Sequence, residues 1–176
     1  MDTFKTALTL ITRYCFLASI DFKDAYYTIP VANHYRRFLR FTFNGQVYQF
    51  NALPNGLASA PRMFTKVTKP IFSTLRKEGH QNCPYIDDSM LVGDSVSDCR
   101  KNVIDTTIVA LKAGFIVHPS KPVSEPSQIL EFLGFVINIV LMIVSLTSQK
   151  ATKLKTFCEN LLQSEKATIQ EVAQVV

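Results

Sequence analysis

The chain has 176 residues, of which 47% are hydrophobic and 19% are charged. This length and composition suffice for one domain with a packed core and exclude an intrinsically disordered protein. The formal net charge of +5 is compatible with a polyanionic partner, although ordinary solvated surfaces reach similar values.

The cysteines and the hydrophobic runs exclude further classes of protein. The cysteines are scattered, with no pair at metal-ligand spacing, so neither a zinc site nor a disulfide framework is expected. The amino terminus lacks the apolar core of a secretory signal. The apolar segment 132–146 is shorter than the roughly 20 residues that a bilayer crossing requires. We therefore expect an intracellular protein, in the nucleus or cytoplasm, without a membrane partner.

The first part of the chain predicts a strand, a hairpin and a helix. An apolar run over 15–20 is strand-like. Alternating aromatic and polar residues around Asn44–Gly45, a favoured two-residue turn, predict a β-hairpin at about 38–50. A helix is predicted over 59–79, and Pro70 is expected to kink or split it.

The second part predicts short strands and amphipathic helices. Strands are expected at 82–85 and 89–93, a helix at 95–113, two buried strands within 132–146, and a further helix at 148–162. Strands and helices in this uneven order predict an α+β fold, with helices covering one side of a sheet.

Three details of these elements can be tested directly. In the helix at 95–113 the core-facing residues are expected to be Cys99, Val103, Thr107, Ala110 and Leu111. Ser148 is the expected N-cap of its helix, and the hairpin turn in 132–146 is expected near Asn138. A capping-box pattern at 168–171 opens another helix just before Val176, so we expect the chain to be part of a longer protein.

Acidic residues stand at unusual places. Asp87 and Asp88 are adjacent and follow a strand-like run, and Asp21 follows another. Carboxylates held close together repel one another unless a cation supplies the missing charge. Mg²⁺ prefers oxygen ligands and usually works through one or two carboxylates and substrate phosphates. The alternative for the Asp87–Asp88 pair is turn chemistry alone, because Asp tolerates tight backbone geometry.

Four motifs occur in a fixed order along nearly the whole chain: Ser19–Tyr27, Leu53–Pro61, Tyr85–Asp88 and Phe132–Phe135. In this order and spacing they resemble the reverse transcriptase domain of retroelements, and most closely the DIRS-like, tyrosine-recombinase group of retrotransposons. The resemblance implies an α+β polymerase palm, with an antiparallel sheet backed by helices, part of the fingers and the start of the thumb. Residues 1–147 would form the palm with partial fingers, and 148–176 the truncated start of the thumb or connection.

The resemblance also implies the catalytic residues. Asp21 and Asp87 would hold two Mg²⁺ ions, for which Mn²⁺ could substitute, with the carbonyl of Phe22 assisting and Asp88 as a third ligand. Lys121 matches a lysine that protonates the leaving pyrophosphate, and a plain surface charge is the alternative for it.

A nucleotide-binding set follows from the same motifs: Phe22, Asp24, Ala25, Tyr26, Asn55 and Gly56. Tyr26 matches a sugar gate that excludes a 2′ hydroxyl, with core packing as the alternative. The neighbouring Tyr27 is expected to face away from the nucleotide. Many relatives carry Gln or Phe where this chain has Asn55, which leaves the strength of that contact open.

Phe132, Leu133 and Gly134 match the hairpin that grips the primer strand, and a buried strand with a glycine bulge is the alternative. The implied partners are an RNA or DNA template with its primer, deoxynucleoside triphosphates and the rest of a retrotransposon polyprotein.

Relatives carry a fingers segment upstream of the first aspartate, and too few residues precede Asp21 to contain it. The rival hypotheses are a non-catalytic nucleic-acid-binding copy of the fold and another palm-type enzyme such as a nucleotide cyclase.

Overall fold

The computed structural model describes residues 2–118, 125–163 and 167–173. The helices are α1 Phe4–Thr9, the 3₁₀ helix η1 Ala25–Thr28, α2 Asn33–Arg36, α3 Ala60–Lys77, α4 Val96–Lys112, α5 Ser148–Gln163 and α6 Ile169–Ala173. The strands are β1 Phe16–Lys23, β2 Arg40–Phe43, β3 Gln46–Gln49, β4 Gln81–Tyr85, β5 Asp88–Gly93, β6 Ile116–Val117, β7 Ile129–Phe132, β8 Phe135–Asn138 and β9 Ile143–Leu146.

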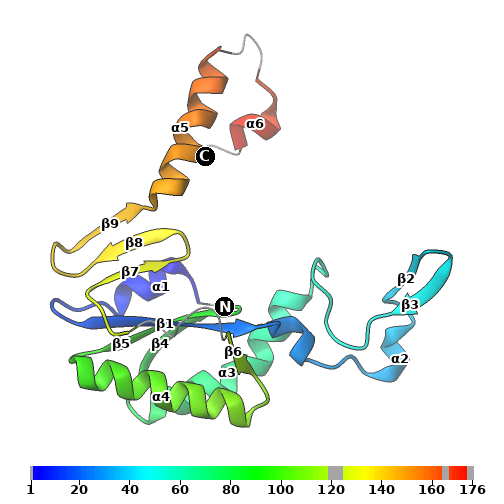
Figure 1. Ribbon diagram of the computed structural model, residues 1–176, viewed down its shortest axis with the longest axis horizontal. Helices are drawn as coiled ribbons and strands as arrows, with labels where there is room; N and C mark the ends of the chain where they lie inside the picture. Colours follow the sequence, from blue (N-terminus) through cyan, green and yellow to red (C-terminus); the bar gives the residue numbers. More distant parts are fainter. Residues whose placement is uncertain (1, 119–124, 164–166, 174–176) are drawn as a thin grey trace.

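A four-stranded sheet in the order β4-β5-β1-β6 forms the centre of the molecule. Helices α3 and α4 cover one face, while α1 and the smaller sheet β7-β8-β9 lie over the other (Figure 1). The hairpin β2–β3 and α2 project from one end of the central sheet, and α5 extends away from β9 (Figure 1). The pairings within these sheets are antiparallel, so the predicted α+β class is confirmed.

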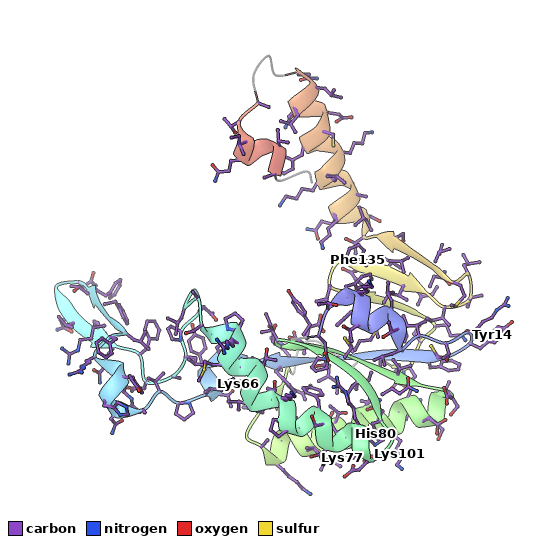
Figure 2. All side chains as sticks on the ribbon, turned by 180° about the vertical axis from the view of Figure 1, so that it is seen from behind. Tyr14, Lys66, Lys77, His80, Lys101 and Phe135 are labelled. Carbon is purple, nitrogen blue, oxygen red and sulfur yellow. The ribbon has the colours of Figure 1, made fainter. Side chains whose placement is uncertain are left out.

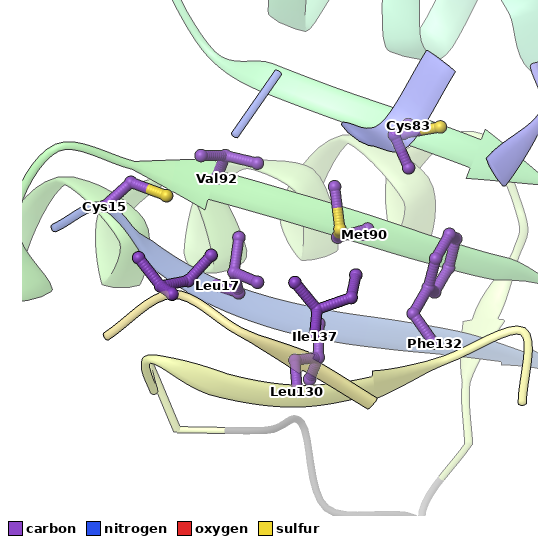
Figure 3. Packing of buried hydrophobic residues seen from close by; sticks show 10 residues of the cluster. Cys15, Leu17, Cys83, Met90, Val92, Leu130, Phe132 and Ile137 are labelled. Atoms are coloured by element: carbon purple, nitrogen blue, oxygen red, sulfur yellow. The ribbon is translucent and has the colours of Figure 1, made fainter. Parts of the chain in front are cut away.

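Alternating residues of β1 and β5 belong to two hydrophobic clusters, one on each face of the central sheet. Leu17, Met90 and Val92 join the cluster under β7 and β8 (Figure 3). Ile20 and Leu91 join the cluster under α3 and α4. Both faces are therefore packed, and the strands can be shifted in register only by exposing apolar side chains.

The hairpin and the two long helices occur where the sequence predicts them. Strands β2 and β3 pair around Asn44–Gly45. Pro70 does not split α3, which runs unbroken from Ala60 to Lys77. Pro70 lies on the exposed side of this helix, where water can satisfy the carbonyl that has lost its partner.

The buried side of α4 differs from the prediction. Cys99 and Ala110 are buried, but Leu111 is 52% exposed. The buried positions between them are Asn102 and Thr106. Asn102 Nδ2 donates to the carbonyls of Gln81 (2.7 Å) and Val92 (3.0 Å), and Thr106 Oγ1 donates to Asn102 Oδ1 (3.1 Å). At Asn102 hydrogen bonds to the sheet thus take the place of apolar packing, while Val103 and Ala110 pack on the core as predicted.

The segment 132–146 contributes to three strands rather than two buried ones. β9 is exposed along its whole length, whereas β7, at the other edge of the small sheet, buries Leu130 and Phe132 against the core. The turn falls directly after Asn138, whose Oδ1 accepts a hydrogen bond from the Leu141 amide (3.0 Å). The N-cap of α5 is Thr147 rather than Ser148, since Thr147 Oγ1 accepts from the Lys150 amide (3.3 Å).

In residues 2–118, 125–163 and 167–173, no helix combines the length and the apolar composition needed to cross a membrane.

Candidate active site

The antiparallel register of β1 and β5 places Asp21 directly opposite Asp88. Directly opposed residues of such a pair have Cβ atoms about 4.5–5.5 Å apart and point to the same face. The amide of Phe22 donates to the carbonyl of Asp87 at 2.9 Å, which brings Asp87 beside the end of β1. Acidic residues that are more than sixty positions apart in sequence therefore meet at one point.

The alternation of β1 and β5 determines which face carries the carboxylates. Asp21 shares its face with Leu17, and Asp88 shares its face with Met90. This is the face that bears β7 and β8, opposite to α3 and α4. Asp87 itself is exposed at the turn. The carboxylates thus lie at the end of the sheet where an incoming molecule can reach them.

The turn between β4 and β5 holds a strained residue. Ile86 has φ +56°, in the left-handed region that β-branched residues avoid. Ile86 is also partly buried against the cluster under α3 and α4. Such a conformation costs about 1–3 kcal/mol and persists where the surroundings determine it. Here the packed strands on either side hold Ile86 in this conformation, and they thereby fix the direction of Asp87.

A pocket of about 320 Å³ opens beside Asp87. Its lining is Phe22, Asp24, Ala25, Tyr26, Tyr27, Asn55, Ile86 and Asp87. Five of these residues belong to the nucleotide-binding set expected from sequence, and Asp87 belongs to the catalytic set. The structure therefore gathers residues from β1, η1, the loop before α3 and the β4–β5 turn around one space.

Tyr26 stands between the pocket and the core. Its ring packs edge-on against Phe64, with 5.4 Å between centroids. Burial raises the pKa of the Tyr26 hydroxyl, and the charge of Asp87 raises this pKa further. The two alternatives for Tyr26 are thus compatible, because one side of the ring packs on the core and the residue also lines the pocket beside Asp87.

The expectation for Tyr27 is wrong. Tyr27 lines the same pocket as Tyr26, because successive residues of a 3₁₀ helix are only about 120° apart and can share a wall. Asn55 Nδ2 donates to the Tyr27 hydroxyl at 3.4 Å. Tyr27 and Ile86 are pocket residues that sequence reasoning missed, and the pair of adjacent tyrosines was the available signal for the first.

Gly56 does not line this pocket but determines the course of the loop. Its φ is +84°, and a Cβ built there would meet nothing within 4 Å. Backbone conformation, and not lack of space, is therefore the reason for glycine at this position.

The predicted grip residues form a tight turn on the small sheet. Phe132 pairs with Phe135, so Leu133 and Gly134 are the two turn residues, with φ of +52° and +76°. The alternative of a glycine bulge inside a strand is therefore wrong. Leu133 and Tyr85 both pack against the cluster under β7 and β8.

The donor set fits a hard divalent cation. Carboxylates of Asp21 and Asp88 face each other, and like charges directly opposed in a sheet destabilise it unless a cation intervenes. Oxygen ligands of this kind suit Mg²⁺. Within the described ranges, no three or more His, Cys, Asp or Glu side chains are already gathered as a metal-binding group. Lys121 lies outside the described residues.

The family can now be identified from comparison with known proteins. A family model described as "Reverse transcriptase (RNA-dependent DNA polymerase)" matches residues 2–137. The chain therefore belongs to the reverse transcriptase family.

Relatives occur in retroelement polyproteins. The chain is 28% identical over 139 residues to the retrovirus-related Pol polyprotein of transposon gypsy from Drosophila melanogaster, covering 78% of this chain and 13% of that protein. It is 30% identical over 129 residues to the Gag-Pol polyprotein of bovine immunodeficiency virus (strain R29), covering 68% of this chain and 8% of that protein. The chain thus spans only a small part of these relatives. None of the relatives named here supports the narrower DIRS-like placement.

Solved structures show the same fold. The foamy viral protease-reverse transcriptase in complex with an RNA/DNA hybrid matches with a TM-score of 0.74 and 22% identity, over 94% of this chain and 21% of that chain. The same viral protein in complex with dsDNA matches with a TM-score of 0.73 and 22% identity, over 94% of this chain and 32% of that chain.

Proposed function

We propose that this chain is the catalytic core of an RNA-directed DNA polymerase, which extends a primer on an RNA or DNA template during retrotransposition. The observation that carries the proposal is the pairing of Asp21 with Asp88, next to the turn whose Asp87 lines a pocket together with Tyr26, Tyr27 and Asn55. The relatives are Pol polyproteins, and the matching viral structures hold an RNA/DNA hybrid or dsDNA.

In the reaction, the primer's 3′ oxygen forms a bond to the innermost phosphorus of a deoxynucleoside triphosphate, the bond to the next phosphate breaks, and pyrophosphate leaves. Asp21, Asp87, Asp88 and the carbonyl of Phe22 would hold two Mg²⁺ ions, or Mn²⁺ in their place. When bound, such ions stabilise charge on the entering and leaving oxygens. Asp87, which lines the pocket, would direct that charge toward it.

The pocket residues would select the nucleotide. The Tyr26 ring is held by Phe64 and would pack beneath the sugar, leaving no room for a 2′ hydroxyl. Asn55, held by the Tyr27 hydroxyl, would contact the triphosphate or the templating base pair. Gly56 gives the loop the turn that brings Asn55 to this wall.

The finer assignments belong to the same proposal. Residues 1–147 would act as palm with partial fingers and 148–176 as the start of the thumb, within a larger retrotransposon polyprotein. Phe132, Leu133 and Gly134 would contact the primer strand, and Lys121 would protonate the pyrophosphate. The DIRS-like placement is a hypothesis drawn from the motifs alone.

Primer extension with the Asp87→Asn variant tests the function. We expect the wild-type chain to extend a primer with Mg²⁺, and Asp87→Asn to be slower by about a thousandfold, because several kcal/mol of charge stabilisation would be lost. Asp94→Asn is the matched control, since Asp94 is an exposed carboxylate just beyond the opposite end of β5.

Two results would contradict the polymerase proposal. Duplex binding without extension by the wild-type chain would favour a non-catalytic nucleic-acid-binding copy of the fold. Turnover of nucleoside triphosphates without any template would favour a cyclase-type enzyme.

A further inference from the structure

The side chain of Lys150, in the first turn of α5, lies against the Leu133–Gly134 turn. Its Nζ donates to the carbonyl of Leu133 at 3.0 Å. The same ammonium group lies over the ring of Phe135, 5.2 Å from the centroid. A Cβ built on Gly134 would collide with the end of the Lys150 side chain, so the lysine covers the turn directly.

Helix stability does not explain a lysine at this position. The first turn of a helix has a positive partial charge and favours acidic residues, whereas α5 has none there. The ammonium group is therefore at the less favourable end of its own helix. The contacts with Leu133 and Phe135 offset this, because a charged donor meets a carbonyl and an aromatic face.

The turn needs such a partner. Leu133 adopts a positive φ, which is unfavourable for a residue with a Cβ, and its carbonyl is the acceptor that Lys150 binds. The amide of Thr147 also donates to the Gly134 carbonyl at 3.4 Å. The start of α5 is thus joined to both residues of the turn.

Among the described residues, full burial of a side chain does not anchor α5. No residue between Ser148 and Gln163 is buried. Phe135, by contrast, is fixed, because its ring stacks on Phe4 of α1 with 4.2 Å between centroids. Figure 2 shows Phe135 at the junction between the small sheet, α1 and the start of α5.

We propose that Lys150 is a positioning residue that fixes the Leu133–Gly134 turn to the start of α5, so that turn and helix meet the primer strand as one unit. The primer contact rests on the proposed polymerase function. The attachment of the turn to the helix does not rest on that function, and it can be tested on the protein without nucleic acid.

The first experiment measures amide hydrogen exchange at Thr147 and Ala151 in the chain without nucleic acid. Lys150→Met keeps the apolar stem and removes the ammonium group. We expect exchange at both amides to rise about tenfold in this variant, since a charge-assisted bond closes the junction. Lys150→Arg retains a donor and a cation, so its exchange should stay close to that of the wild type.

Lys153→Met is the matched control. Lys153 is on the same helix but lies over Phe157, 5.9 Å from its ring centroid, away from the turn. The variant changes net charge equally and should leave exchange at Thr147 unchanged. Equal exchange in Lys150→Met and Lys153→Met would overturn the proposal, whether or not the chain proves to be a polymerase.

The second experiment measures single-nucleotide incorporation. We expect Lys150→Met to lower the maximal incorporation rate about tenfold while the nucleotide KM stays the same, because the primer terminus and not the nucleotide pocket is displaced. Lys150→Arg should restore most of the rate. A looser junction with an unchanged rate would overturn the positioning role, and absence of incorporation by the wild type would count against the polymerase function alone.

Discussion

The hairpins β2–β3 and β4–β5 have the same simple topology but opposite surroundings. Every residue of β2 and β3 is exposed, whereas β5 is buried from Ser89 to Gly93. The first hairpin is held by its own ladder and by ring contacts of Phe41 with Tyr48 and Phe50, at 5.6 and 5.0 Å. The second is held by β1 and by a cluster on each face. Tertiary packing therefore fixes the carboxylates, while local pairing suffices for β2–β3.

The turns differ in the same sense. Asn44 and Gly45 have φ of +48° and +74°, which both residue types tolerate. Ile86 has φ +56°, which a β-branched residue avoids. A turn that local preference favours can therefore stand alone, whereas a strained turn beside Asp87 requires the rest of the sheet to hold it.

Removing one core side chain should give the largest contrast between the hairpins. Met90→Ala in β5 is expected to lower the free energy of unfolding by about 2–5 kcal/mol, because it leaves a cavity at a fully buried site. Val47→Ala in β3 should change it by less than about 0.5 kcal/mol, since Val47 is 69% exposed. Urea unfolding measures both. Similar losses would mean that β2–β3 is as firmly packed as the central sheet.

The same contrast explains what could be predicted from the sequence. The Asn44–Gly45 turn and the helix that begins after Ser95 depend on neighbouring residues, and both occur as predicted. The positions of Asp21 and Asp88 follow from the order of the family motifs.

What was missed depends on contacts between distant segments. The burial of Asn102 depends on carbonyls of β4 and β5, and the exposure of β9 depends on the small sheet placing β7 and β8, but not β9, against the core. The position of Tyr27 in the pocket depends on the 3₁₀ helix η1, which no residue pattern predicted. Hydrophobic periodicity carries none of this information.

Alkaline pH should weaken the β4–β5 side of the molecule selectively. Burial raises the pKa of the Cys83 thiol in β4 from its ordinary value of 9.0 to about 11, and burial does the same for Cys99 of α4. Between pH 9 and 11 the unfolded chain loses these protons while the folded chain keeps them, so stability falls as pH rises. The expected slope is about 1.4 kcal/mol per pH unit for each thiol.

Urea midpoints between pH 8 and 10.5 measure this slope. Cys83→Ala should make it shallower than in the wild type, whatever the variant does to stability at neutral pH. Cys158→Ala is the control, because Cys158 lies on α5 outside the central core and is only partly buried. An unchanged slope in Cys83→Ala would show that this thiol does not remain protonated in the folded chain.

Turn glycines provide a finer comparison. Gly45 and Gly134 have nearly equal φ, +74° and +76°, but a Cβ at Gly45 meets nothing within 4 Å and one at Gly134 meets Lys150. Gly45→Ala should cost about 1–2 kcal/mol of backbone strain. Gly134→Ala should cost about 1 kcal/mol more, because the Lys150 ammonium is displaced from the Leu133 carbonyl. In a Lys150→Ala background this excess should vanish, and its persistence would rule out the lysine as the cause.

The smallest effect concerns a single hydroxyl in the pocket. Tyr27→Phe removes the acceptor to which Asn55 Nδ2 donates at 3.4 Å. We expect the nucleotide KM to rise about two- to fivefold, in keeping with one exposed neutral hydrogen bond, while stability changes by less than about 0.5 kcal/mol. Tyr48→Phe is the matched control, since its hydroxyl also takes part in one side-chain hydrogen bond, which it donates to Gln46 Oε1 at 2.9 Å, on the β2–β3 hairpin. Because both variants lose the same atom, an equal change in KM would mean that the hydroxyl acts generally and not through Asn55. A change in KM confined to Tyr27→Phe would show that the Tyr27 hydroxyl holds the Asn55 side chain in place in the pocket wall.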